Sequence, residues 1–276
     1  MHHWIYDHRI RIGTSGWAGN GWRKLFYPPE LPEEEWLSHY AERFDTVELT
    51  ATCYRLPEEE MFLRWREAVP EGFLFSVKAP HRICRRKRLR NCFTDMMHFF
   101  LRVELLDDRL GPIVWQLPPT LKRDEEALAD FLPRLPRDMA HVIEFRHASW
   151  HSARVRDMLE QHDVSMAFHD YDGRRTPWWV TGPVVFFRLN GMQAQKRCYG
   201  LAGLEPFVED MERAMDEDGR PVFVSFGDDA EGCAVRDASI LQHLAGLPPA
   251  MPLVVAEAER ERTAIPLAIA REDLAH

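Results

Sequence analysis

Five short apolar runs in this chain each end in a charged or polar residue, which a strand buried on both faces would not normally carry. They are Val47-Glu48, Phe75-Ser76-Val77-Lys78, Val114-Trp115-Gln116, Val142-Ile143-Glu144-Phe145-Arg146 and Val185-Phe186-Phe187-Arg188-Leu189-Asn190. Sheets and barrels of the α/β class place ligands at the carboxyl ends of their parallel strands. The repeated pattern therefore predicts parallel strands that open onto one shared polar pocket.

Strand-like and helix-like patterns alternate along most of the chain. Apolar runs predict eight strands, near residues 9–13, 46–49, 73–78, 113–117, 141–146, 164–168, 184–189 and 222–226. About seven of the connections have a helical pattern, including 93–106, 206–217 and 233–244. The connection 172–183 is too short and too rich in Gly and Pro for a full helix.

These patterns predict an α/β fold, a single (β/α)8 TIM-like barrel with a short irregular connection after strand six and a C-terminal extension. We place the barrel domain at residues 1–247 and the extension at 248–276. A doubly wound sheet is the competing architecture. No Gly-x-Gly-x-x-Gly follows a strand, so the best sign of a dinucleotide-binding fold is missing.

Composition excludes several classes of protein. No apolar run approaches the roughly 18 residues that a bilayer span needs, and the first residues lack a signal-like pattern, so we expect a cytoplasmic protein without membrane contact. The five cysteines are odd in number and have no paired spacing, which argues against a disulfide framework and against a structural zinc site. The net charge of -9 opposes non-specific binding to nucleic acid.

One segment contradicts this acidic average. Six of the ten residues from His81 to Arg90 are Lys or Arg, beginning with Arg82. The run is either a solvated loop that balances acidic helices nearby or an anion-binding lip. The sequence leaves both interpretations open.

The polar strand ends supply the candidate site residues. Side chains alternate in direction along a strand, so Glu144 and Arg146 share one face of their strand, and Arg188 and Asn190 share one face of theirs. We expect the catalytic residues to be Glu48, Glu144 and Lys78, and the substrate-binding residues to be Arg146, Arg188, Gln116, Tyr54, Asn190, Asp228 and Arg82. The alternative is an ion-pair belt that only fills a polar barrel mouth. Only His169-Asp170 joins a histidine to a carboxylate locally, so we expect no metal and no cofactor.

Several segments, taken in order, resemble the YecE-like family, also called the domain of unknown function 72 family. The matching segments are 12–17, Trp22, 26–28, 44–48, 54–57, 73–80, 110–112, 116–119, and Glu144-Phe145-Arg146-His147 with Ser149-Trp150. The last of these is the most specific. The resemblance reaches to about Leu244, implies a TIM-like barrel and supplies no reaction.

The chain also departs from that family's pattern. Thr50 stands where the pattern has Asn, Cys53 where it has Phe, and Ile83-Cys84 where it has Thr-His. Near the end of the barrel, Asn190 replaces a histidine, and Gly227-Asp228 replaces an Asn-Asn pair. These changes point to an altered substrate, an altered chemistry or a lost activity.

The sequence favours an enzyme of unassigned reaction that acts on a small anionic or phosphate-bearing compound. In this interpretation Lys78, Arg146 and Arg188 hold the anion, and Glu144 or Glu48 transfers a proton. A nucleic-acid-binding or nucleic-acid-processing protein that uses the run 82–90 is the first alternative, possible but not favoured. A non-catalytic ligand-sensing or partner-binding barrel is the second. The sequence does not give the oligomeric state.

Overall fold

A computed structural model describes residues 10–19, 21–171, 174–190, 198–216, 219–227 and 232–252. Within these ranges, parallel strands form a nearly closed barrel with the neighbour order β1-β9-β8-β6-β5-β4-β3-β2. The strands are β1 Ile10–Thr14, β2 Thr46–Leu49, β3 Leu74–Lys78, β4 Leu110–Leu117, β5 His141–Phe145, β6 Ser165–Tyr171, β8 Val185–Leu189 and β9 Val222–Phe226. A two-residue strand, β7 (Arg174–Arg175), pairs with β6 in antiparallel fashion. The predicted TIM-like barrel is confirmed.

The barrel closes through its first strand. β1 pairs with β9 from Ile10↔Val222 to Thr14↔Phe226, as closure of the predicted barrel requires. On its other side β1 meets β2 through one isolated bridge between Ser15 and Glu48. The backbones approach so closely here that a Cβ on Gly13 would lie 2.1 Å from the carbonyl oxygen of Thr46. Glycine at position 13 is therefore required for closure.

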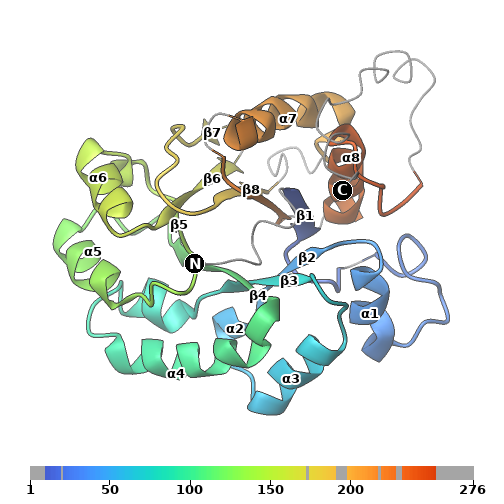
Figure 1. Cartoon of the computed structure of the whole chain (residues 1–276), viewed down its shortest axis with the longest axis horizontal. Helices are drawn as coiled ribbons and strands as arrows, with labels where there is room; N and C mark the ends of the chain where they lie inside the picture. Colours follow the sequence, from blue (N-terminus) through green and yellow to red (C-terminus); the bar gives the residue numbers. More distant parts are fainter. Residues whose placement is uncertain are drawn as a thin grey trace, which may run out of the picture.

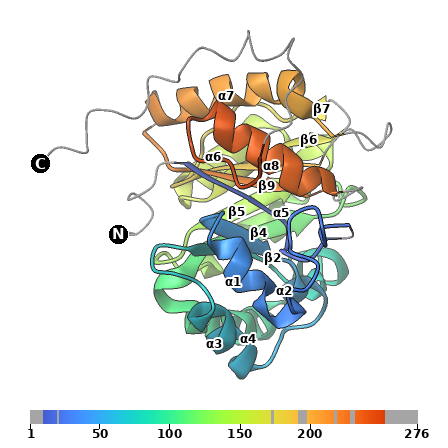
Figure 2. The same ribbon diagram turned by 90° about the vertical axis from the view of Figure 1, so that its right-hand side faces the viewer.

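Helices surround the strands on the outside of the barrel (Figure 1). They are α1 Trp36–Ala41, the short α2 Ala51–Tyr54, α3 Glu59–Glu67, α4 Phe93–Val103, α5 Glu125–Phe131, α6 Ala153–Gln161, α7 Gly200–Asp216 and α8 Cys233–Leu244. Figure 2 shows α7 and α8 together on one side of the barrel, opposite α1 and α3. A small apolar cluster that includes Val114, Val142 and Phe186 fills the barrel, while a larger one packs the strands against the helices.

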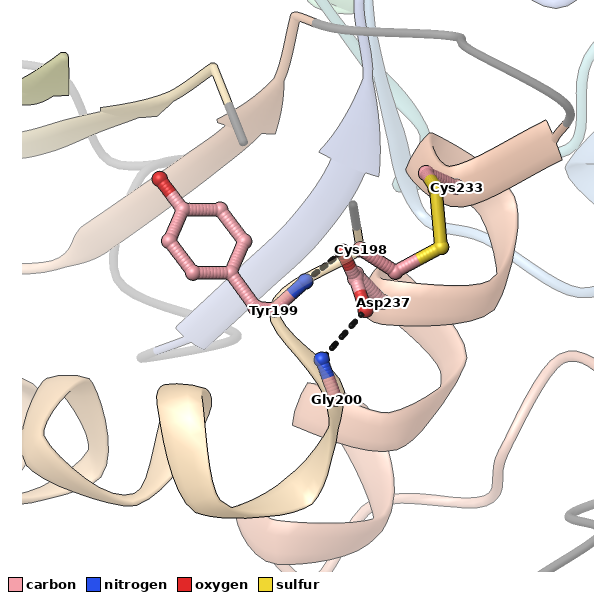
Figure 3. Close-up of a disulfide and its surroundings, with 5 residues drawn as sticks. All are labelled: Cys198, Tyr199, Gly200, Cys233 and Asp237. Carbon is pink, nitrogen blue, oxygen red and sulfur yellow. Dashed lines mark hydrogen bonds between the residues drawn. A yellow bond between two sulfur atoms is a disulfide. The ribbon is translucent and has the colours of Figure 1, made fainter. Parts of the chain in front are cut away.

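Helix α7 begins at Gly200, six residues before the expected start at Pro206. The reason is a cap supplied by another helix. The carboxylate of Asp237, in α8, accepts hydrogen bonds from the backbone N–H groups of Tyr199 (2.8 Å) and Gly200 (3.1 Å) (Figure 3). These are donors that the first turn of a helix leaves without intrahelical partners.

A disulfide joins Cys198 to Cys233, 35 residues apart, beside this cap (Figure 3). The cysteine count argued against a disulfide framework and did not predict this single pair. Cys53, Cys84 and Cys92 are free and buried.

Only the first residues of the predicted C-terminal extension are described. They attach to α8, because the backbone N–H of Ala250 donates to Gln242 and that of Met251 donates to Ser239, both at 2.9 Å. Among the residues that the structure describes, no helix is long and apolar enough to cross a membrane.

Candidate functional site

The floor of the barrel mouth holds a buried ion pair between Arg188, at the end of β8, and Glu48, in β2. Arg188 Nη1 donates to Glu48 Oε2 at 2.6 Å, and Nη2 donates to Oε1, so the contact is bidentate. The Ser15 hydroxyl donates to the same carboxylate at 2.7 Å and contacts the Ser225 hydroxyl at 3.0 Å. Glu48 and Arg188 are only 1% and 2% exposed. Bidentate, buried pairing of this kind fixes both side chains.

The surroundings keep both members of this pair charged. Burial alone would raise the pKa of Glu48, but Arg188, Lys78 and the hydrogen bond from Ser15 outweigh it and hold that pKa below its usual value. Burial would lower the pKa of Arg188, whereas Glu48 and Glu144 raise it above the ordinary value. The carboxylate of Glu48 is therefore ionised at neutral pH.

Glu144, at the end of β5, continues the network. It is fully buried, and the Gln116 side-chain amide donates to its two oxygens at 2.9 and 2.8 Å. Arg146 Nε lies 3.6 Å from one oxygen and Arg188 Nε lies 3.7 Å from the other. We call the series Glu48, Arg188, Glu144 and Arg146 the charged belt. Gln116 orients its central carboxylate.

Lys78, at the end of β3, stands beside the belt. It is partly exposed, and its backbone carbonyl accepts the Thr52 hydroxyl at 2.7 Å. Its positive charge helps to lower the pKa of Glu48. Among the described residues it forms no ion pair within 4.0 Å, in contrast to Arg188. Lys78 is therefore a cation of the mouth without a direct ion-pair partner in the described part of the chain.

The basic run 81–90 divides into two sets. Arg82 and Lys87 pair with Asp95 at 2.6 and 2.7 Å, and Arg90 pairs with Asp124 at 2.8 Å. Arg85, Arg86 and Arg88 are exposed and form no ion pair in the described part of the chain. Half of the run therefore balances acidic residues of neighbouring elements, and half remains uncompensated.

Arg85 and Arg86, two of the arginines without an ion pair, lie close to Lys78. Burial, followed by the charges of Arg85, Lys78 and Arg86, lowers the pKa of His81, so these four groups lie within electrostatic range of one another. The Tyr54 ring, 82% exposed, contacts the His81 ring edge-on at 5.0 Å. We call Lys78, His81, Arg85 and Arg86 the cationic lip. The exposed Tyr54 ring lies beside this cluster of positive charge.

Two further candidates lie at the ends of β8 and β9. A Cβ on Gly227 would lie 2.4 Å from the Asn190 side-chain oxygen and 3.5 Å from Arg188. Asn190 therefore occupies space that any side chain at position 227 would need. Asp228 lies outside the described residues.

The structure thus brings Glu48, Glu144, Arg146, Arg188 and Gln116 together. Lys78 adjoins them, and Tyr54 lies at the lip, whereas Arg82 is engaged by Asp95. The sequence interpretation missed Ser15 and Ser225, which hold Glu48 and Arg188. Inward alternation along β1 and β9 was the signal that could have revealed them.

Two other kinds of site were considered, a cysteine nucleophile and a metal site. Cys84 is buried, and burial raises the pKa of its thiol, which disfavours the nucleophilic thiolate. His169 Nε2 lies 2.8 Å from the carbonyl oxygen of Phe145. Within the described ranges, no three His, Cys, Asp or Glu side chains are arranged to hold a metal ion.

Comparison with known proteins places the chain in a family. The family model described as "Protein of unknown function DUF72" matches residues 11–262. UPF0759 protein YecE of Escherichia coli K12 is 35% identical over 139 residues, covering 50% of this chain and 48% of that protein. UPF0759 protein YunF of Bacillus subtilis is 28% identical over 151 residues, covering 52% of each. The aligned region therefore spans about half the length of these curated relatives.

Solved structures show the same fold. A DUF72 family protein, TM1631, from Thermotoga maritima superposes with a TM-score of 0.74 at 23% identity, covering 86% of this chain and 99% of that one. A DUF72 family protein from Enterococcus faecalis, EF0366, gives 0.71 at 18% identity, covering 90% and 100%. Because the family model matches nearly the whole barrel, the chain belongs to the DUF72 family.

Proposed function

We propose that this protein binds and acts on a small anionic or phosphate-bearing compound at the carboxyl ends of its barrel strands. The observation that carries the proposal is the uncompensated charge of the cationic lip. Three permanent cations, Lys78, Arg85 and Arg86, gather there without a carboxylate partner in the described residues. Like charges held close together attract an anion, and guanidinium groups match phosphate and carboxylate oxygens well.

The charged belt has a different role in this proposal. Arg188 is already engaged by Glu48 and Glu144, so it acts as a positioning residue and leaves anion capture to the lip. Arg146, at the outer end of the belt, adds positive charge toward the mouth. We assign proton transfer to Glu144, because it accepts hydrogen bonds from a neutral amide while Glu48 is held by a bidentate guanidinium.

Nucleic-acid binding is the second candidate. Exposed Arg85, Arg86 and Arg88 beside the exposed Tyr54 ring resemble the charge-plus-stacking arrangement of single-strand binders. The net charge of -9 opposes it everywhere except at this lip. Tight oligonucleotide binding that weakens steeply with salt would rank it first. A ligand-sensing barrel without catalysis would bind the same anion and show no turnover.

The test is stabilisation of the folded state by inorganic phosphate. A ligand that binds only the folded protein raises the thermal midpoint, so phosphate and sulfate should stabilise the wild type more than chloride at equal ionic strength. The variants Lys78→Met and Arg85→Gln/Arg86→Gln should lose most of that increment. Arg64→Gln is the matched control and should keep it, because Arg64 is an exposed arginine of α3 that forms no ion pair with any described residue. Equal increments in all four proteins would show that the salt acts generally and would refute the anion site.

The cytoplasmic location stays a prediction. The Cys198–Cys233 disulfide belongs to a type that is rare in cytosolic proteins. Trapping free thiols at the moment of cell lysis, followed by mass spectrometry of the two cysteines, would show which redox compartment the protein occupies.

A further inference from the structure

A cavity of about 200 Å³ lies between the outer face of the barrel and helix α7. Phe168 and Asp170 of β6, Phe187 and Leu189 of β8, and Phe207 of α7 contribute to its walls, together with His169, Arg175, Thr176, Trp178, Asp210 and Arg213. Because side chains alternate along β8, Phe187 and Leu189 point away from the charged belt that Arg188 joins. The cavity is therefore separate from the barrel mouth.

The size of this cavity exceeds that of an ordinary packing defect. A volume of 200 Å³ compares with roughly 30 Å³ per water molecule in the liquid, and cavities of about 150 Å³ accommodate a benzene ring. Protein interiors otherwise contain few voids larger than one water molecule. A ring-sized organic molecule fits the space.

Asp170 is the group in this cavity without a matching charge. It is 9% exposed, and the Tyr199 hydroxyl donates to its Oδ2 at a long 3.3 Å. Its Oδ1 is buried without a hydrogen-bond partner, and the carboxylate forms no ion pair among the described residues. A buried carboxylate without a cation or a full set of donors is costly, so the site calls for an N–H-bearing cation.

The other charged groups of the lining are already engaged. Asp210 pairs with Arg175 at 3.1 Å, and the Arg175 guanidinium lies 4.4 Å from the Phe207 ring. Arg213 lies 4.9 Å from the Trp178 ring. The inner walls are aromatic, with Trp178 stacked on Phe168 at 4.5 Å. The cavity is thus partly open, with aromatic inner walls, polar groups elsewhere in its lining and one acidic group that no described residue matches.

We propose that this cavity is a binding site for a small organic ammonium ion, whose N–H group donates to Asp170 and whose apolar body packs against Phe168, Phe187 and Phe207. The charge of the ammonium neutralises Asp170, and its hydrogen bond satisfies Oδ1. The aromatic walls cover the rest of the molecule, as in small-molecule sites that combine an apolar lining with a few placed polar groups. This site is independent of the anion site at the mouth.

The test uses benzylamine, which is protonated at neutral pH, and benzyl alcohol, its neutral analogue of similar shape. Calorimetric or NMR titration should show benzylamine binding to the wild type and much weaker binding of benzyl alcohol. Asp170→Asn should weaken benzylamine binding by about tenfold or more, because it removes the buried charge while keeping the shape. Glu205→Gln, which removes an exposed carboxylate of α7 that does not line the cavity, is the control and should bind benzylamine about as well as the wild type.

Leu189→Phe provides a second variant that leaves Asp170 intact and reduces the space beside it. It should block benzylamine while the stabilisation by phosphate at the mouth is unchanged, which separates this proposal from the anion site. Equal affinity of the wild type for benzylamine and benzyl alcohol would overturn the proposal. Full benzylamine affinity in Asp170→Asn would overturn it as well.

Discussion

Asp237 gives the most direct quantitative prediction from this structure. Its carboxyl group is 2% exposed and caps α7 through the backbone N–H groups of Tyr199 and Gly200 (Figure 3). Burial raises its pKa from 3.8 to about 6, although the two hydrogen bonds and the charge of Arg236 act in the opposite direction. Keeping the Asp237 carboxyl group ionised in this buried cap therefore costs free energy.

The raised pKa determines the sign and size of a pH effect. Between 3.8 and about 6 the folded state holds the Asp237 proton more tightly than the unfolded state does, so the contribution of this group to stability falls as the pH rises. It is fully present below the unfolded pKa and is lost once the pH passes the folded pKa. At 1.36 kcal/mol per pH unit, a difference of about 2 corresponds to about 3 kcal/mol.

The perturbation is Asp237→Asn, which cannot ionise and keeps one oxygen that can accept from the α7 backbone. We expect the unfolding free energy of Asp237→Asn, relative to wild type, to rise by about 2.4 kcal/mol from pH 4 to pH 7. Urea unfolding of both proteins at several pH values measures it, and titrations common to both cancel in the difference. Asp157→Asn, an exposed carboxyl on α6, is the control and should show little pH dependence.

Two outcomes would refute this reasoning. A difference that does not change with pH would mean that the Asp237 carboxyl has the same pKa in both states. A difference that falls as the pH rises would mean that the cap stabilises the carboxylate more than burial destabilises it.

Two further predictions concern the same side of the barrel. Reducing the disulfide, or replacing Cys198 by Ser, should lower the unfolding free energy by up to about 4 kcal/mol, because the bond closes a loop across a separation of 35 residues. Unchanged urea unfolding under reducing conditions would contradict the pairing. Gly227→Ala should destabilise by about 1–3 kcal/mol through its contact with Asn190. Adding Asn190→Gly should recover most of that loss, and strictly additive effects in the double variant would show that the two positions do not interact.

Local pattern predicted the strands well, because a barrel strand buried on both faces is a short apolar run with clear ends. The predicted ranges 46–49 and 222–226 match β2 and β9 residue for residue. The start of α7, the helix before β9, was harder to predict. Its first turn contains no strong local cap, and the residue that caps it, Asp237, comes from α8, 37 residues beyond Gly200. A cap supplied from such a distance leaves no local signal.

In the candidate site, too, the local sequence predicted some features, whereas others depend on residues far apart in the chain. Polar residues at strand ends predicted that Glu48, Glu144 and Arg188 would converge. The choice of partners depends on the neighbour order of the strands, which places β1 and β9 between β2 and β8 and lets Arg188 reach Glu48 past Ser15. The disulfide was missed for a similar reason, because Cys198 and Cys233 become neighbours only after α7 packs against α8.

Two pairs of residues that depart from the family pattern lie next to one another in space. Asn190 and Gly227 are far apart in the sequence, yet the Asn190 side chain fills the space beside the missing side chain of Gly227. Cys53 likewise lies near Cys84; after burial, its charge is the next cause of the raised pKa of the Cys84 thiol.

The groups that do not depart form the charged belt with Gln116, and Lys78 stands beside it. A barrel that had lost all function would have no reason to bury Glu48, Glu144 and Arg188 together, because burying charges costs more than filling the same space with apolar side chains. Our proposal of a ligand-binding site therefore rests on the belt and on the lip beside it. Anion selectivity should then depend on the lip, and proton transfer on the belt.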